Sequence, residues 1–199
     1  MTFPGIPNFD ASYPKVMSPE GLAHVVLRTS DLKRMQEFYT TFLGGTVTYG
    51  SEVISFITYD EEHHRIALLE VPDTKVKNPL TCGLEHIAFS FGSLSSLLLA
   101  YRQRKAKGIH PIWCVNHGPT TSIYYKDPDG NMLETQVDNF DTVYATTQFM
   151  TSESFAENPV GTDFDPEELI SAIQKGVPES TLKQRKEIGA RPMPDLASM

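Results

Sequence analysis

The 199-residue sequence has two cysteines, Cys82 and Cys114, and neither belongs to a C-x-x-C pair. This scarcity excludes a disulfide framework and a multi-cysteine metal site, and it is typical of a reducing compartment. No stretch approaches the roughly 18 apolar residues of a membrane helix. The N-terminal region also lacks the basic segment and apolar run of a secretory signal. We therefore expect a soluble, cytoplasmic protein without a membrane partner.

Positive charge is also scarce, because 17 lysines and arginines stand against 25 aspartates and glutamates, for a net charge of −8. Proteins that bind nucleic acid normally show the opposite balance, since lysine and arginine neutralise the phosphates. The hydrophobic fraction of 40% in a chain of 199 residues is enough to bury a core without cross-links. The composition therefore predicts a small-molecule partner and no nucleic acid.

The sequence predicts the same order of elements twice, namely a strand, an amphipathic helix and three more strands. Both copies begin with a related motif, Gly21-Leu22-Ala23-His24 and Gly83-Leu84-Glu85-His86. The spacing of the two motifs is too long for a solenoid repeat and is typical of a duplicated module. The first copy is expected as strand 21–29, helix 30–45 and strands near 45–50, 53–59 and 64–71, and the second as strand 83–91, helix 92–108 and strands near 110–115, 119–126 and 131–137.

The segments outside the repeats are not expected to form cores of their own. Residues 1–20 are rich in proline and predict an extended arm, whereas residues 139–199 are polar and predict one short helix near 166–177. The sequence thus predicts an α+β fold. Two tandem βαβββ modules, 21–72 and 83–138, should form one cupped metal-binding cavity, with an N-terminal arm and a C-terminal appendage.

Three residues occupy the places where a metal site is expected. His24 and His86 lie on the first strands of the two modules, and Glu134 lies on the last strand. A pseudo-twofold relation between the modules should bring the matching strands together, so that the two imidazoles face one shared cavity. Two imidazoles and one carboxylate form the facial set that holds non-haem Fe(II) with open coordination positions. A single histidine on an apolar strand is more often a core residue, but the repeated pair with a carboxylate favours metal binding.

The paired modules, the stretch AHVVLRTSDLKRMQEFYTTFLGG and the ending YYKDPDGNMLE resemble the vicinal oxygen chelate superfamily. This superfamily includes glyoxalase I, bleomycin-resistance proteins and the type I extradiol dioxygenases, and the resemblance covers about residues 20–138. The turn Asp127-Pro128-Asp129-Gly130 has residues that close a hairpin and deliver Glu134 from the returning strand. The resemblance implies the fold and the metal site of the superfamily.

The stretch DEEHHRIAL is similar to the histidine-bearing strand of the extradiol enzymes. That resemblance implies that His64 is an active-site group near the metal but not a ligand, where an imidazole can accept the second phenolic proton of a catechol. On a strand the neighbouring His63 should point to the opposite face, in a structural role.

The stretch SIYYKDPDGNMLE matches the pattern that precedes the glutamate ligand in those enzymes, with Ser122, Tyr124 and Glu134 in register. The resemblance implies that Tyr124 forms a hydrogen bond with a substrate oxygen. It also implies that His117, about two residues out of the family register, donates a proton or positions the ring.

The resemblance therefore implies a non-haem Fe(II) dioxygenase that takes a catecholic substrate and dioxygen and cleaves the ring beside the two hydroxyls. The same donors also accept Mn(II), Zn(II) or Ni(II). Two alternatives stay open. Glu70, at the strand parity of His64, could be a fourth ligand in a glyoxalase I-like isomerase or lyase, or the fold could bind a ligand without metal as resistance proteins do. We also expect a homo-oligomer.

Overall fold

The computed structural model describes residues 12, 14–78 and 80–195. Most of the expected N-terminal arm lies outside the described residues, and residues 14–20 are exposed and contain neither helix nor strand. Within the described part of the chain, no helix is long and apolar enough to cross a membrane.

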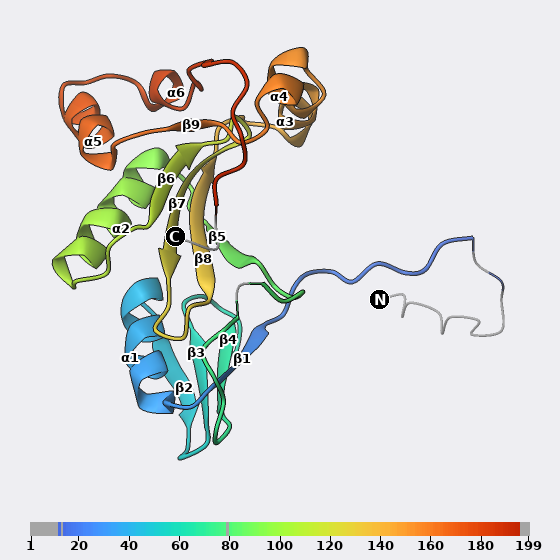
Figure 1. Ribbon diagram of the computed structural model, residues 1–199, viewed down its shortest axis with the longest axis vertical. Coiled ribbons are helices and arrows are strands. Elements are labelled where there is room, and N and C mark those ends of the chain that lie inside the picture. Colours follow the sequence, from blue (N-terminus) through green and yellow to red (C-terminus); the bar gives the residue numbers. More distant parts are fainter. Residues whose placement is uncertain (1–11, 13, 79, 196–199) are drawn as a thin grey trace, which may run out of the picture.

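Two sheets form the body of the molecule, one from each module (Figure 1). The first has four strands in the order β1-β4-β3-β2, and the second has five in the order β5-β8-β7-β6-β9. In both sheets the first strand of the module pairs in parallel with its last strand, and the remaining pairs are antiparallel. The strands are β1 (Val25–Thr29), β2 (Thr46–Gly50), β3 (Ile54–Thr58), β4 (Ile66–Glu70), β5 (His86–Ser90), β6 (Trp113–Asn116), β7 (Thr120–Lys126), β8 (Met132–Asp138) and β9 (Thr162–Asp163).

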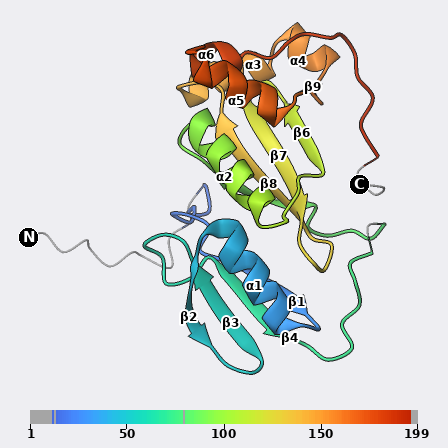
Figure 2. The same cartoon turned by 90° about the vertical axis from the view of Figure 1, so that its left-hand side faces the viewer.

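One helix covers one face of each sheet, and both helices lie on the same side of the molecule (Figures 1 and 2). Helix α1 (Leu32–Leu43) begins after Asp31, whose side chain accepts a hydrogen bond from the Arg34 backbone, and it ends at Gly44, where φ is 64°. Helix α2 (Leu94–Ala106) begins after Ser93, which caps it in the same way. Side-chain oxygens at these positions satisfy backbone N–H groups that have no partner inside the helix. Both helices therefore begin at a residue whose side chain caps the first turn.

The hydrophobic core lies between the helices and the sheets and continues from one module into the other. Phe42 of α1 contacts the rings of Phe89 and Tyr125 in the second module, with centroids 6.2 Å and 5.2 Å apart. The guanidinium of Arg104 lies 4.1 Å from the centre of the Phe42 ring, and its Nε donates to the Phe42 carbonyl. The opposite faces of the sheets are more open and carry the candidate functional residues.

The C-terminal appendage has more structure than the sequence predicts. The expected helix near 166–177 is present as α5 (Pro166–Gln174), but strand β9 and three further helices were not expected. Strand β9 extends the second sheet by pairing with β6, and Glu167 of α5 accepts hydrogen bonds from Tyr101 and Arg102 of α2. The other helices are α3 (Val143–Met150), α4 (Glu153–Glu157) and α6 (Glu179–Leu182).

The two cysteines should differ strongly in reactivity. Cys82 is exposed, whereas burial and the carboxylates of Asp165 and Asp163 raise the pKa of Cys114 to about 12. Because only the thiolate is nucleophilic, a raised pKa leaves Cys114 almost entirely as the unreactive thiol at pH 8. We expect Ellman's reagent to titrate one thiol quickly in the native protein and the second only after denaturation. Two equally fast thiols would contradict this assignment.

Candidate active site

Four of the predicted residues gather on the open face of the second sheet. His86 begins β5, Tyr124 lies on β7, Glu134 lies on β8, and His117 lies in the turn between β6 and β7. Tyr124 and Glu134 are register partners in antiparallel strands, so their side chains leave the same face of the sheet. We call these four residues the second-sheet cluster.

Two close contacts organise the second-sheet cluster. The Nε2 atom of His86 lies 3.0 Å from a carboxylate oxygen of Glu134, whose side chain is 6% exposed. The Nε2 atom of His117 lies 3.0 Å from the hydroxyl of Tyr124, and the rings of Tyr124 and His86 are 5.6 Å apart. The structure therefore brings two of the three predicted metal ligands together, beside two of the three predicted catalytic residues.

Burial and hydrogen bonding set the charges of this cluster. Burial alone would raise the pKa of Glu134, but hydrogen bonds from His86 and Ser122 hold it below its usual value. Burial, reinforced by the nearby Glu134 carboxylate, raises the pKa of Tyr124. Burial also lowers the pKa of His117. At neutral pH the site thus contains an ionised carboxylate, a protonated tyrosine and a neutral imidazole at His117.

The remaining predicted residues form a separate group on the first sheet. The rings of His24 and His64 are 4.3 Å apart, and Phe56 stacks on His64 at 4.4 Å. His63 lies with them, since its Nδ1 is 2.5 Å from Nδ1 of His64. The expectation that His63 and His64 point to opposite faces is therefore wrong. Its physical reason is that β4 begins at Ile66, so both histidines lie in the bend before the strand.

The environment of His64 suits a proton acceptor. Burial, together with the imidazoles of His24 and His63, lowers the pKa of His64. Each neighbouring imidazole would repel a second positive charge, so the ring stays neutral at pH 7. A neutral imidazole has one free nitrogen lone pair for a substrate proton.

Glu70 lies on the other face of the first sheet. It pairs in register with Thr29, which is fully buried, and its Oε2 accepts a hydrogen bond of 3.0 Å from the backbone N–H of Leu32. Glu70 therefore caps the start of α1 and does not point toward the histidines. Glu70 does not share a face with His64, because His64 precedes β4 and strand alternation does not extend to it. A fourth metal ligand at Glu70 is not supported by this geometry.

One pocket is lined by residues of both modules. His24 and Ala88 line the same pocket, of about 130 Å³. Ala88 lies two residues after His86 on β5, so both side chains share a face of the strand. Among the described residues, no three histidine, cysteine, aspartate or glutamate side chains lie close enough together to hold a metal ion. The donors fit Fe(II) in kind, and His86 and Glu134 also lie close together, while His24 lies against His64 on the first sheet.

Three groups near the site have no role in the predictions from the sequence. Trp113 stacks on Tyr124 with ring centres 5.1 Å apart, and Ser122 is fully buried next to Glu134. The third group is the backbone carbonyl of Val160, which lies 2.5 Å from Nδ1 of His117. Ser122 belongs to a motif that the sequence reveals, but no local pattern indicates that Val160 reaches the site.

The sequence matches the family model of the Glyoxalase/Bleomycin resistance protein/Dioxygenase superfamily over residues 21–135. The chain belongs to this superfamily. The match spans the first βαβββ module and the second as far as residue 135 in β8, and it includes His24, His86 and Glu134.

Two proteins of Rhodococcus globerulus are each 45% identical to this member of the superfamily. They are biphenyl-2,3-diol 1,2-dioxygenase 2, similar over 78% of this chain and 83% of its own, and biphenyl-2,3-diol 1,2-dioxygenase 3, over 82% and 87%. A glyoxylase/bleomycin resistance protein/dioxygenase domain from Frankia sp. EAN1pec has a similar solved structure, with a TM-score of 0.52 and 21% identity over 61% of this chain and 99% of that one. The similarity to this solved structure is evidence for the fold alone.

Proposed function

We propose that this chain is an extradiol-type dioxygenase that opens the ring of a catecholic substrate with dioxygen. In this proposal His24, His86 and Glu134 hold Fe(II). The observation that carries the proposal is the second-sheet cluster, where a carboxylate–imidazole pair 3.0 Å apart lies beside a buried Tyr124–His117 pair. The names of both Rhodococcus globerulus relatives specify a vicinal aromatic diol and a dioxygenase, which supports the same chemistry.

Each residue has a distinct task in this reaction. Bound Fe(II) would supply electrophilic activation of the diol and of dioxygen. His64, kept neutral by its surroundings, accepts the second phenolic proton. Tyr124 stays protonated, and its hydroxyl forms a hydrogen bond with a substrate oxygen. His117 holds that hydroxyl in position through its own hydrogen bond of 3.0 Å.

The walls of the site suit an aromatic substrate. Trp113 stacks on Tyr124 with an interplanar angle of 24°, and Phe56 stacks on His64 with an angle of 12°. Flat rings on both sheets offer apolar surfaces against which a substrate ring can pack. We therefore propose an aromatic vicinal diol, not an aliphatic one.

Anaerobic loading with Fe(II) tests the proposed function directly. The apoprotein is loaded with Fe(II), mixed with a panel of catechols and then exposed to air, while oxygen uptake and yellow ring-fission products are followed. We expect both signals with at least one aromatic diol and neither signal without Fe(II). No uptake with any diol, together with Ni(II)- or Zn(II)-dependent turnover of a hemithioacetal, would instead establish a glyoxalase-type reaction.

Replacement of His64 by alanine should separate catalysis from metal binding. Since His64 is proposed to move a proton without holding the metal, the variant should bind Fe(II) normally and lose about 10²- to 10⁴-fold in kcat. Metal analysis and oxygen uptake measure the two quantities. His110→Ala is the matched control, because His110 is an exposed histidine ahead of β6. Loss of metal from the His64 variant would show that His64 is itself a ligand.

A further inference from the structure

The C-terminal appendage contacts His117 at the ring nitrogen that is not bonded to Tyr124. Its Nδ1 lies 2.5 Å from the carbonyl oxygen of Val160, and its Nε2 lies 3.0 Å from the hydroxyl of Tyr124. A carbonyl oxygen only accepts hydrogen bonds, so Nδ1 must carry the hydrogen. In the neutral ring Nε2 is then an acceptor, and the Tyr124 hydroxyl donates to it. The contact with Val160 thereby sets the direction of the hydrogen bond inside the second-sheet cluster.

This direction matters because Tyr124 has a second acceptor close by. The carboxylate of Glu134 is near enough to form a hydrogen bond with the same hydroxyl. If His117 carried its hydrogen on Nε2, it would donate to Tyr124, and the tyrosine proton would turn to Glu134. A carboxylate engaged in this way is a poorer donor to a metal ion. The Val160 contact therefore keeps the Tyr124 proton directed away from Glu134.

Glycine at position 161 makes the close approach of Val160 feasible. Gly161 has φ of +102°, and a Cβ atom there would lie 2.2 Å from the Asn116 carbonyl oxygen and 2.7 Å from the Cα of His117. Contacts this short cannot occur, and the backbone conformation itself disfavours other residues. The side chain of Asn158, 1% exposed, accepts from the Gly161 N–H and donates to its carbonyl, which fixes the loop.

Arg185 ties this loop to the turn that carries His117. Its side chain is 1% exposed, and its Nη1 donates to the carbonyls of His117 and Asn158 at 3.2 Å and 2.6 Å. Its Nη2 donates to the backbone carbonyl and the hydroxyl of Ser154 in α4. The same Nη2 lies 2.7 Å from a carboxylate oxygen of Glu187, which balances the positive charge of the guanidinium. The buried guanidinium of Arg185 thus joins its own segment to the turn of His117 and to the segment of Ser154 and Asn158. Figure 1 shows the appendage lying across the end of the second sheet where this turn is found.

We propose that Val160, Gly161 and Arg185 form a positioning clamp for His117, which fixes the hydrogen on Nδ1 and so directs the Tyr124 proton to His117. The catalytic consequence rests on the proposed function, whereas the position of the hydrogen does not. The appendage is then part of the active site, although it lies outside the residues matched by the family model.

Imidazole ¹⁵N–¹H correlation spectra of the full-length chain, without added metal, test the clamp. His117 is assigned by loss of its signals in His117→Gln, and we expect the hydrogen on Nδ1. Gly161→Ala should shift His117 toward a mixture of the two tautomers. In the Fe(II)-loaded variant, kcat should fall by about 10- to 100-fold, as for other groups that orient a ligand, with a smaller change in KM.

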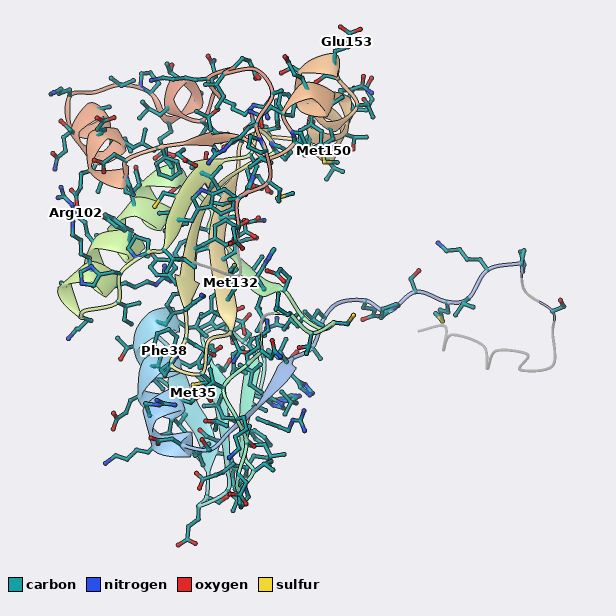
Figure 3. All side chains as sticks on the ribbon, viewed as in Figure 1. Met35, Phe38, Arg102, Met132, Met150 and Glu153 are labelled. Atoms are coloured by element: carbon teal, nitrogen blue, oxygen red, sulfur yellow. The ribbon has the colours of Figure 1, made fainter. Side chains whose placement is uncertain are left out.

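Three further variants separate the clamp from general stability. Arg102→Gln is the control, because Arg102 projects from α2 on the side away from β8 and ties α5 to the body through Glu167 (Figure 3). It should leave the His117 tautomer and kcat unchanged. Arg185→Gln leaves Gly161 in place and provides the second test if Gly161→Ala does not fold, and Arg185→Lys should restore part of the tautomer preference.

Two results would overturn the clamp: hydrogen on Nε2 of His117 in the parent chain, or an unchanged tautomer in both Gly161→Ala and Arg185→Gln. Failure of the proposed function looks different. In that case the Nδ1 hydrogen and its loss in the variants are still seen, but no diol gives oxygen uptake with the parent chain.

Discussion

Replacing Glu134 by glutamine should remove both the metal and the ring-cleaving activity. The carboxylate contributes a negative charge and lone pairs to the proposed site, whereas an amide contributes no charge and brings two N–H donors. Glu134 is buried 3.0 Å from His86, so no solvent-exposed carboxylate can take its place without rearrangement. We expect Fe(II) affinity to fall by more than the roughly 100-fold typical of outer-shell groups, and oxygen uptake to fall below detection. Metal analysis after desalting and an oxygen electrode measure both effects.

Glu70→Gln is the matched control for this experiment. Glu70 caps α1 through the Leu32 N–H, and a glutamine amide oxygen can still accept that hydrogen bond, so the variant should keep its metal and activity and lose at most about 1 kcal/mol in the free energy of unfolding. Urea denaturation measures that loss. If Glu70→Gln loses its metal while Glu134→Gln retains it, the proposed ligand set is wrong and the glyoxalase-type alternative gains support.

Local patterns in the sequence are sufficient to place the proposed ligands on the second sheet. The GL-x-H motif places His86 at the start of a strand, and alternation across the β7–β8 hairpin puts Tyr124 and Glu134 on one face. Both helix starts were also predictable, because Asp31 and Ser93 have side chains that satisfy the first backbone N–H groups. In all these cases the structure depends on neighbours in the chain or on a directly paired strand.

The arrangement around His64 could not be predicted in the same way, because it depends on where β4 begins. Side chains hold residues 58–62 in a bend: the Thr58 hydroxyl donates to the Glu62 carbonyl at 2.6 Å, and Asp60 accepts from the Glu62 N–H. Such hydrogen bonds compete with the sheet for backbone groups. The strand consequently starts late, which brings His63 and His64 together and places Glu70 on the other face.

The sequence indicates too little structure in the appendage because long-range contacts hold its short helices. Glu179 at the start of α6 accepts hydrogen bonds from the backbone N–H groups of Leu94 and Ser95, at 2.9 Å and 3.1 Å, and so caps α2 from outside. Helices this short are not stable alone, so local propensity carries little information about them. The same holds for the Val160–His117 contact, which joins positions far apart in the chain.

Replacing Phe42 by alanine should cause a large loss of stability, because this ring joins the two modules. Its side chain is 2% exposed, and it contacts Phe89 and Tyr125 of the second module and the guanidinium of Arg104. Removal of a buried phenylalanine typically costs about 3–5 kcal/mol, through lost burial and the cavity left behind. The cation–π contact with Arg104, whose Nη1 has no hydrogen-bond partner in the described structure, is lost as well.

Urea unfolding, monitored by circular dichroism and by fluorescence, measures this loss in the free energy of unfolding. Phe38→Ala is the matched control, because Phe38 stacks on Phe42 at 5.4 Å but is only partly buried. It should cost clearly less than Phe42→Ala. Since the core is continuous across the modules, both probes should report one transition in both variants. Equal losses in the two variants, or separate transitions in the parent chain, would mean that Phe42 does not couple the modules, and the pocket between His24 and Ala88 would then lie between independently folding halves.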